Sequence, residues 1–204
     1  MKIVQIAGYL GSGKTTLVVE LGRKLSAGGL KVAILVNEVG EVPVDGKVIE
    51  EFGLTVKDIG GGCICCQVAG NLLHTLKLLS MGAKPDFIII EPTGMAVPNA
   101  VRDVMKPAAD KLDLVMGPTI VLLDTGRFEK LLTYETLKRL VATQLKDADV
   151  IALSKVDAVD AAKREKAEAA AREINSEARV LGLSTFTGEG VPEVIAFMKE
   201  MVIA

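Results

Sequence analysis

The sequence predicts an α/β domain in which a doubly wound, mostly parallel sheet is flanked by helices. Short runs rich in Val, Ile and Leu alternate with helix-like segments, the order expected of parallel strands joined by crossover helices. Half of the residues are hydrophobic but only 3% are aromatic, which indicates a core of aliphatic side chains. The 204 residues suit one such domain, with no repeat or low-complexity linker. We therefore expect residues 1–204 to form a single domain.

The first strand, expected at residues 2–7, runs directly into a phosphate-binding loop. Residues 8–16 read G-x-x-x-x-G-K-T-T, and helical leucine spacing follows them. Glycines in such a loop let backbone N–H groups approach a triphosphate closely, while Lys14 places an ammonium between the β- and γ-phosphates. The Thr15 hydroxyl is a hard oxygen ligand for Mg²⁺. The expected nucleotide-binding residues are Gly8, Gly11, Ser12, Gly13, Lys14, Thr15 and Thr16.

Two further strands predict the rest of a P-loop NTPase site. The strand at residues 31–36 ends in the polar segment 37–46, which we interpret as a switch loop, with a plain surface loop as the alternative. The strand at residues 87–91 ends in Glu91 and is followed by Pro-Thr-Gly, the form of a Walker B strand. Its acid should lie within reach of the Mg²⁺ beside the phosphate loop.

The remaining segments continue the alternation. Residues 55–59 read as either a short strand or an irregular segment. We expect helices at 71–81, 128–145, 160–174 and 192–201, and strands at 119–124, 150–153 and 180–183.

The tetrapeptide Ser154-Lys155-Val156-Asp157 follows a late strand, where guanine-nucleotide proteins carry their base-reading motif. A carboxylate at Asp157 accepts hydrogen bonds from guanine N1–H and the exocyclic amine, whereas adenine has no N1 donor. Lys155 would pack its stem on the base, and Ser184 and Thr185 would lie in a second base-binding loop. The alternative is a capped helix start. We favour GTP and GDP over ATP.

All three cysteines lie in one cluster, Cys63, Cys65 and Cys66. Thiolates bind Zn²⁺ or Cu(I) tightly, and three of them leave the fourth position to a carboxylate, His74, water or another subunit. An open position suits metal transfer better than a permanent structural zinc. Reduced thiols near the core are the alternative.

Composition limits the partners. Net charge is −2 and no basic tail is present, which argues against nucleic acid as the main partner. No apolar run reaches the length of a membrane span, and the N-terminal apolar stretch is interrupted by the glycine-rich loop. We expect a cytoplasmic protein without a membrane partner.

Together these motifs resemble the CobW/HypB/UreG family of P-loop GTPases, and most closely its CobW-like metallochaperone branch. The resemblance rests on the phosphate loop, residues 37–46, the Gly-Gly-Cys-x-Cys-Cys run at 61–66, Glu-Pro-Thr-Gly at 91–94 and the base motif. It implies a GTPase that delivers Zn²⁺, Co²⁺ or Ni²⁺, or a metallocofactor, to a client protein, with dimerisation linked to nucleotide or metal. Such proteins usually add a C-terminal domain, which these 204 residues do not include.

The resemblance also implies residue roles. Asp45 would join Thr15 and Glu91 around Mg²⁺, and with Lys14 these form the expected catalytic set. Glu41 would stand near Cys65 as an oxygen ligand of the transition metal.

Three other functions stay open at this point. They are a GTPase that gates or repairs a cofactor enzyme such as a corrinoid enzyme, a thiol redox switch on a GTPase, and a small-molecule kinase. Hydrolysis should be slow, since no residue evidently orients the attacking water; Arg102 and Arg127 are candidates for charge stabilisation.

Overall fold

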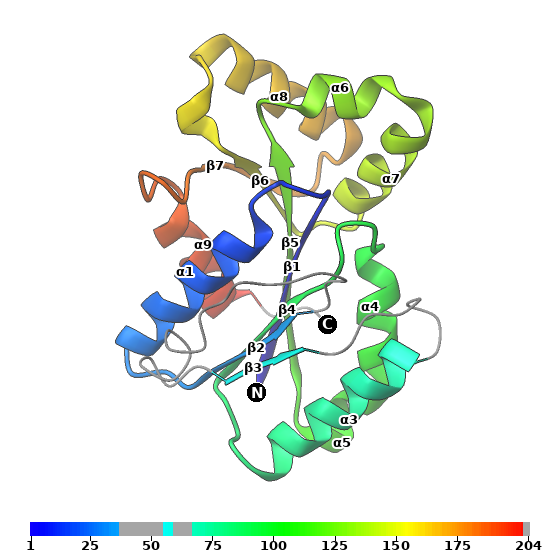
Figure 1. Cartoon of the computed structure of the whole chain (residues 1–204), viewed down its shortest axis with the longest axis vertical. Coiled ribbons are helices and arrows are strands. Elements are labelled where there is room, and N and C mark those ends of the chain that lie inside the picture. Colours follow the sequence, from blue (N-terminus) through cyan, green and yellow to red (C-terminus); the bar gives the residue numbers. More distant parts are fainter. Residues whose placement is uncertain (37–54, 59–66, 202–204) are drawn as a thin grey trace.

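The computed structural model describes residues 1–36, 55–58 and 67–201, which build a parallel sheet of seven strands (Figure 1). The strands are β1 (Lys2–Gly8), β2 (Val32–Val36), β3 (Thr55–Asp58), β4 (Phe87–Glu91), β5 (Val115–Asp124), β6 (Val150–Ser154) and β7 (Arg179–Leu183). Their order in the sheet is β3-β2-β4-β1-β5-β6-β7. The chain winds to one side of β1 and then to the other, so the predicted doubly wound sheet is confirmed.

Helices cover both faces of the sheet (Figure 1). They are α1 (Lys14–Ala27), α3 (Gln67–Met81), α4 (Pro98–Met105), α5 (Ala109–Leu112), α6 (Phe128–Thr133), α7 (Glu135–Lys146), α8 (Ala161–Ile174) and α9 (Val191–Glu200). Short 3₁₀ turns lie at η1 (Lys106–Ala108) and η2 (Val156–Ala158).

Successive side chains of β1 point to opposite faces of the sheet, and each face is covered by its own set of helices. Val4 and Ile6 of β1 pack in one apolar cluster with α1 and α9. Ile3 faces the other way and packs with α3 and α4, while Ala7 packs with α7 and α8 on that same side. Both faces are therefore buried, which explains why the strands are nearly continuous in Val, Ile and Leu.

Strand β5 carries a bulge that sequence reading did not foresee. Pairing with β1 shifts register where Met116 and Thr119 of β5 lie opposite Ile3 and Gln5, so β5 has one residue more than its partner. Pro118 lies in that interval, and a proline without an N–H is accommodated at a bulge. The strand continues through Pro118 and begins at Val115, rather than at the expected residue 119.

Two helical regions differ from expectation. The helix expected over 128–145 is divided at Tyr134, whose backbone is extended at φ −81° and ψ 119°. Neighbouring β-branched and aromatic side chains have weaker helix propensity, which favours a break there. Helix α4 was not predicted, although Pro98 stands at its N-terminus and Val101 and Met105 are buried at helical spacing.

Residues 55–58, left open between strand and irregular structure, form edge strand β3, paired with β2. Within residues 1–36, 55–58 and 67–201, no helix is both long and apolar enough to cross a membrane.

Candidate functional site

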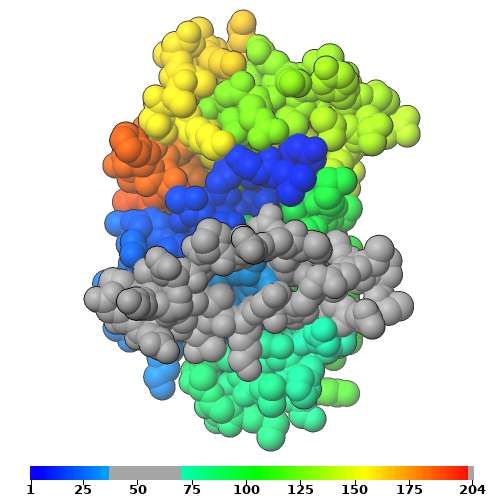
Figure 2. All heavy atoms as spheres, in the orientation of Figure 1, coloured from blue at the N-terminus to red at the C-terminus, as the bar shows by residue number. Residues whose placement is uncertain are grey.

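The candidate site lies at the carboxyl edge of the sheet, where parallel strands end together and ligands bind in open α/β folds. The phosphate loop follows β1, Glu91 ends β4 and Asp124 ends β5, while the base motif and the second loop follow β6 and β7. In the space-filling view, blue atoms of the loop and α1 lie against yellow and green atoms of later segments (Figure 2). Segments distant in sequence therefore meet at one edge.

The phosphate loop has the backbone that its glycines predict. Gly8, Gly11 and Gly13 all have positive φ, at 134°, 74° and 95°. At Gly8 the backbone of β5 is also close, because an added Cβ would lie 2.5 Å from the Leu122 carbonyl oxygen. The residue before α1 is Gly13, which has no side chain to cap the helix, and the positive end of the helix dipole faces the loop.

Two of the predicted magnesium ligands are in contact. The Thr15 hydroxyl donates to Glu91 Oε1 at 2.8 Å. Glu91 is only 2% exposed, at the last position of β4. A hydroxyl and a carboxylate side by side are hard oxygen ligands of the kind that Mg²⁺ takes.

The loop after Glu91 is pressed against the phosphate loop. An added Cβ at Gly94 would lie 2.8 Å from the Leu10 backbone nitrogen, so only glycine fits there. The loop is held from the other side by Gln144 of α7, whose Nε2 donates to the carbonyls of Gly94 (3.1 Å) and Ala96 (2.9 Å). Gln144 is 1% exposed and was not predicted, because nothing in the local sequence links α7 to this loop.

At the base end, Lys155 joins two parts of the site. Its backbone is left-handed at φ 60°, and its Nζ donates to the Gly11 carbonyl at 2.7 Å and to Asp124 Oδ2 at 2.8 Å. Asp124 is nearly buried and also accepts from the Gly126 N–H, so its carboxylate holds the lysine in place. Sequence reasoning missed this role of Asp124, although a carboxylate ending a buried strand could have signalled it.

The carboxylate of Asp157 is exposed and accepts no hydrogen bond from the described residues. The Ser154 Oγ is buried and, among the described residues, has no hydrogen-bond partner; the same holds for the Ser12 Oγ of the phosphate loop.

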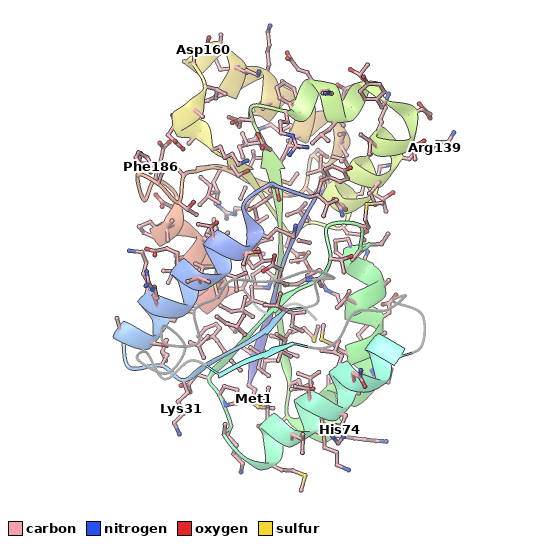
Figure 3. The ribbon with its side chains drawn as sticks, viewed as in Figure 1. Met1, Lys31, His74, Arg139, Asp160 and Phe186 are labelled. Carbon is pink, nitrogen blue, oxygen red and sulfur yellow. The ribbon has the colours of Figure 1, made fainter. Side chains whose placement is uncertain are left out.

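The second loop is a tight turn. Ser184 Oγ accepts from the N–H groups of Phe186 and Thr187 at 3.2 and 3.1 Å, so this buried serine shapes the loop. Thr185 is half-buried, and the Phe186 ring is 90% exposed at the outer rim of the molecule (Figure 3).

Arg164 of α8 ties the two base-end loops together. It donates to the Val156 carbonyl (2.9 Å) and to Glu189 (3.1 Å). The predicted base-end residues are thus brought together by the fold.

The two candidate arginines have different places. Arg127 lies at the site, and its Nη1 donates to the Leu10 carbonyl at 3.1 Å. Arg102 instead donates to Asp149 at 2.6 Å and to the Thr119 hydroxyl at 2.7 Å in a nearly buried cluster. Arg102 therefore stabilises the packing of α4 on the sheet.

The predicted transition-metal ligands, Cys63, Cys65, Cys66 and Glu41, lie outside the described residues, as does Asp45. Within the ranges that the structure does describe, no group of three His, Cys, Asp or Glu side chains could hold a metal. His74 is exposed on α3 (Figure 3). The metal-binding hypothesis therefore stays a prediction from the sequence.

Comparisons with known proteins agree on one family. The sequence model described as "CobW/HypB/UreG, nucleotide-binding domain" matches residues 2–182. The zinc chaperone YeiR of Escherichia coli is 35% identical over 154 residues, covering 74% of this chain and 45% of YeiR. The zinc-regulated GTPase metalloprotein activator 1 of Dictyostelium discoideum is 30% identical, over 86% of this chain and 44% of that protein.

A solved structure agrees in fold. The crystal structure of the Zn(II)-bound YjiA GTPase from E. coli has a TM-score of 0.67 and 26% identity, with 88% of this chain and 56% of that chain covered. The chain thus spans less than half the length of the two relatives above.

Proposed function

The chain belongs to the CobW/HypB/UreG family of nucleotide-binding domains, and from this premise we propose that it binds GTP, hydrolyses it slowly, and uses it to deliver a transition metal to a client protein. Its relatives are named as zinc chaperones and a zinc-regulated GTPase, which supports metal delivery as the class of function. We propose Zn²⁺ as the first candidate for the cargo, with Co²⁺ and Ni²⁺ as alternatives.

The observation that carries the nucleotide part is the 2.7 Å bond from Lys155 Nζ to the Gly11 carbonyl. It joins the segment proposed to read the base to the loop proposed to hold the phosphates. One nucleotide lying along this edge would be recognised at both ends by connected parts of the chain.

Guanine is supported by Asp157. Its exposed carboxylate accepts no hydrogen bond from the described residues, so it can accept from guanine N1–H and the 2-amino group. Adenine offers no donor at N1 and would leave the carboxylate desolvated without compensation. Buried hydroxyls without a described partner, at Ser12 and Ser154, also suit a site completed by a polar ligand.

We assign Mg²⁺ to the Thr15 hydroxyl and the Glu91 carboxylate, with Asp45 as the third ligand expected from the family. When bound, Mg²⁺ would neutralise charge on the β- and γ-phosphates. Thr15 and Glu91 orient each other through their 2.8 Å hydrogen bond, so the ligands are held in one place before the ion arrives. Lys14, only 5% exposed at the start of α1, would add its positive charge to the phosphates.

The cargo metal is proposed to bind through Cys63, Cys65 and Cys66, with Glu41 as a further ligand. Glu41 and Asp45 lie four residues apart, so ordering of Asp45 by the nucleotide would also act on Glu41. Metal affinity would then depend on the bound nucleotide, and the coupling must be reciprocal. A homodimer that depends on nucleotide or metal is part of this proposal.

Substitution Asp157→Asn tests the nucleotide assignment. An amide cannot accept both guanine donors, but it can donate to the C2 carbonyl of xanthine. We expect GTP affinity to fall at least about tenfold, because a hydrogen bond to a charged group is lost, and XTP affinity to rise. Competition against a fluorescent guanine nucleotide, with ATP as a third competitor, measures all three affinities.

The matched control is Glu165→Gln, which removes one exposed carboxylate from α8. It should leave the order of affinities unchanged. Equal affinity of wild type for GTP and ATP would refute guanine selectivity.

A further inference from the structure

We infer that Arg127 is a positioning residue for the nucleotide phosphates: by holding the Leu10 carbonyl, it fixes the Leu10–Gly11 peptide so that the Gly11 N–H stays directed away from the guanidinium and available to a phosphate oxygen. The inference rests on the proposed GTP binding and adds a residue that no sequence motif contains.

The guanidinium lies against this peptide. Arg127 follows β5 and immediately precedes α6, and its Nη1 donates to the Leu10 carbonyl at 3.1 Å. An added Cβ at Gly11 would lie 2.8 Å from the same nitrogen. The Arg127 side chain is exposed and belongs to none of the apolar clusters, so this contact does not serve core packing.

Because the peptide is planar, this contact at the Leu10 carbonyl also fixes the direction of the Gly11 N–H group. In a planar trans peptide the C=O and N–H point in opposite directions. With the Leu10 oxygen on the guanidinium, the Gly11 N–H points away from it, and it donates to no described residue. A phosphate oxygen would meet a donor there instead of a carbonyl.

The hydrogen bond from Arg127 matters because glycine at position 11 does little to restrict rotation of the Leu10–Gly11 peptide. Gly11 has φ +74° and no side chain, so its peptide could rotate at little cost. A rotated peptide would turn a carbonyl oxygen toward a triphosphate. A charge-assisted hydrogen bond from Arg127 biases the peptide against that rotation.

The next carbonyl is held in the same way. Lys155 Nζ binds the Gly11 oxygen at 2.7 Å, while the Ser12 N–H donates to the Tyr9 carbonyl at 3.2 Å. Two successive loop carbonyls are thus held by two cations, from the segments that follow β5 and β6.

The test is the affinity of Arg127→Met, Arg127→Lys and wild type for GDP and for a non-hydrolysable GTP analogue. In Arg127→Met we expect affinity for the analogue to fall about tenfold, the size of one charge-assisted hydrogen bond. The loss should be smaller for GDP, because the N–H acts on phosphate charge. Arg127→Lys should recover part of the loss, and thermal unfolding without nucleotide should be unchanged in both variants.

The matched control is Arg139→Met on α7. Arg139 is exposed and pairs with Glu135 on its own helix, and Figure 3 shows it at the outer rim of the molecule. Its replacement should leave both affinities at the wild-type values.

The outcomes separate this inference from the proposed function. If wild type binds the analogue, and Arg127→Met binds both nucleotides as tightly as wild type does, only the inference about Arg127 is overturned. An equal loss for both nucleotides, or a change confined to turnover, would also overturn it. If wild type binds neither guanine nucleotide, the proposed function and the inference fall together.

Discussion

At the scale of single residues, the pair Thr15 and Glu91 gives the sharpest test of the proposed magnesium site. Glu91→Gln keeps the shape of the side chain and removes its charge at a position only 2% exposed. We expect GTP turnover to fall about a hundredfold, because several kcal/mol of charge stabilisation through the metal are lost. Phosphate release measured across a Mg²⁺ titration should show both the lower rate and a weaker dependence on Mg²⁺.

A substitution outside the site provides the control. Thr143→Ala removes a hydroxyl from α7 that bonds only its own helix, at the Arg139 carbonyl. Turnover in this variant should match wild type. If Glu91→Gln has wild-type turnover and the same Mg²⁺ dependence, Glu91 is not a magnesium ligand.

The roles of residues within a motif were predictable, and the contacts of residues that act from a distance were not. The phosphate loop, Glu91 and Lys155 stand in spacings set by the chemistry of a nucleotide, and the fold brings them to one edge. Asp124 was not predicted, and Arg127 was a candidate only for charge stabilisation; both contact the site because β5 lies beside β1 in the sheet. That neighbourhood depends on strand order, which sequence spacing does not contain.

Among the elements, the segment between Glu91 and α4 depends on α7 for its position. Gln144 is buried and donates to two carbonyls of this segment, at Gly94 and Ala96. Because Gly94 is pressed against Leu10, the segment and the phosphate loop must keep a common position. Helix α7 therefore supports the site through the two hydrogen bonds of Gln144.

This support can be measured as stability. Gln144→Leu keeps an apolar stem of similar size and leaves two buried carbonyls without their donor. We expect the free energy of unfolding in urea to fall by about 1–3 kcal/mol, the cost of a buried unsatisfied polar group.

Lys138→Leu introduces the same side chain at an exposed position of α7 and should change stability by less than about 0.5 kcal/mol. An unchanged unfolding midpoint in Gln144→Leu would show that the two hydrogen bonds do not support the segment.

Element boundaries were the less predictable part of the fold. Continuous apolar runs located β1, β4 and β6 to within two residues. Helix α4 was missed because it is only eight residues long and its buried residues, Pro98, Val101, Arg102 and Met105, include a charged side chain. The bulge in β5 spans Pro118, which has no N–H, and the break at Tyr134 lies where neighbouring side chains have weak helix propensity.

At the scale of the whole molecule, the sheet gathers every described part of the proposed nucleotide site at one edge. The phosphate loop, Glu91 and the base motif come from β1, β4 and β6, and they are linked by the bonds of Thr15 and Lys155. Nucleotide binding would therefore affect the positions of several elements together. The central claim is that this response changes the affinity of the cysteine cluster for metal.

The most direct test is a Zn²⁺ titration of the reduced protein, performed with GDP and with a non-hydrolysable GTP analogue. Wild type and Cys65→Ala are compared, and Co²⁺ and Ni²⁺ follow as alternative cargo. The account predicts tight binding that requires Cys65 and differs at least about fivefold between the two nucleotides, within the usual range of allosteric coupling. The same Zn²⁺ affinity with both nucleotides, or binding that does not need Cys65, would contradict it.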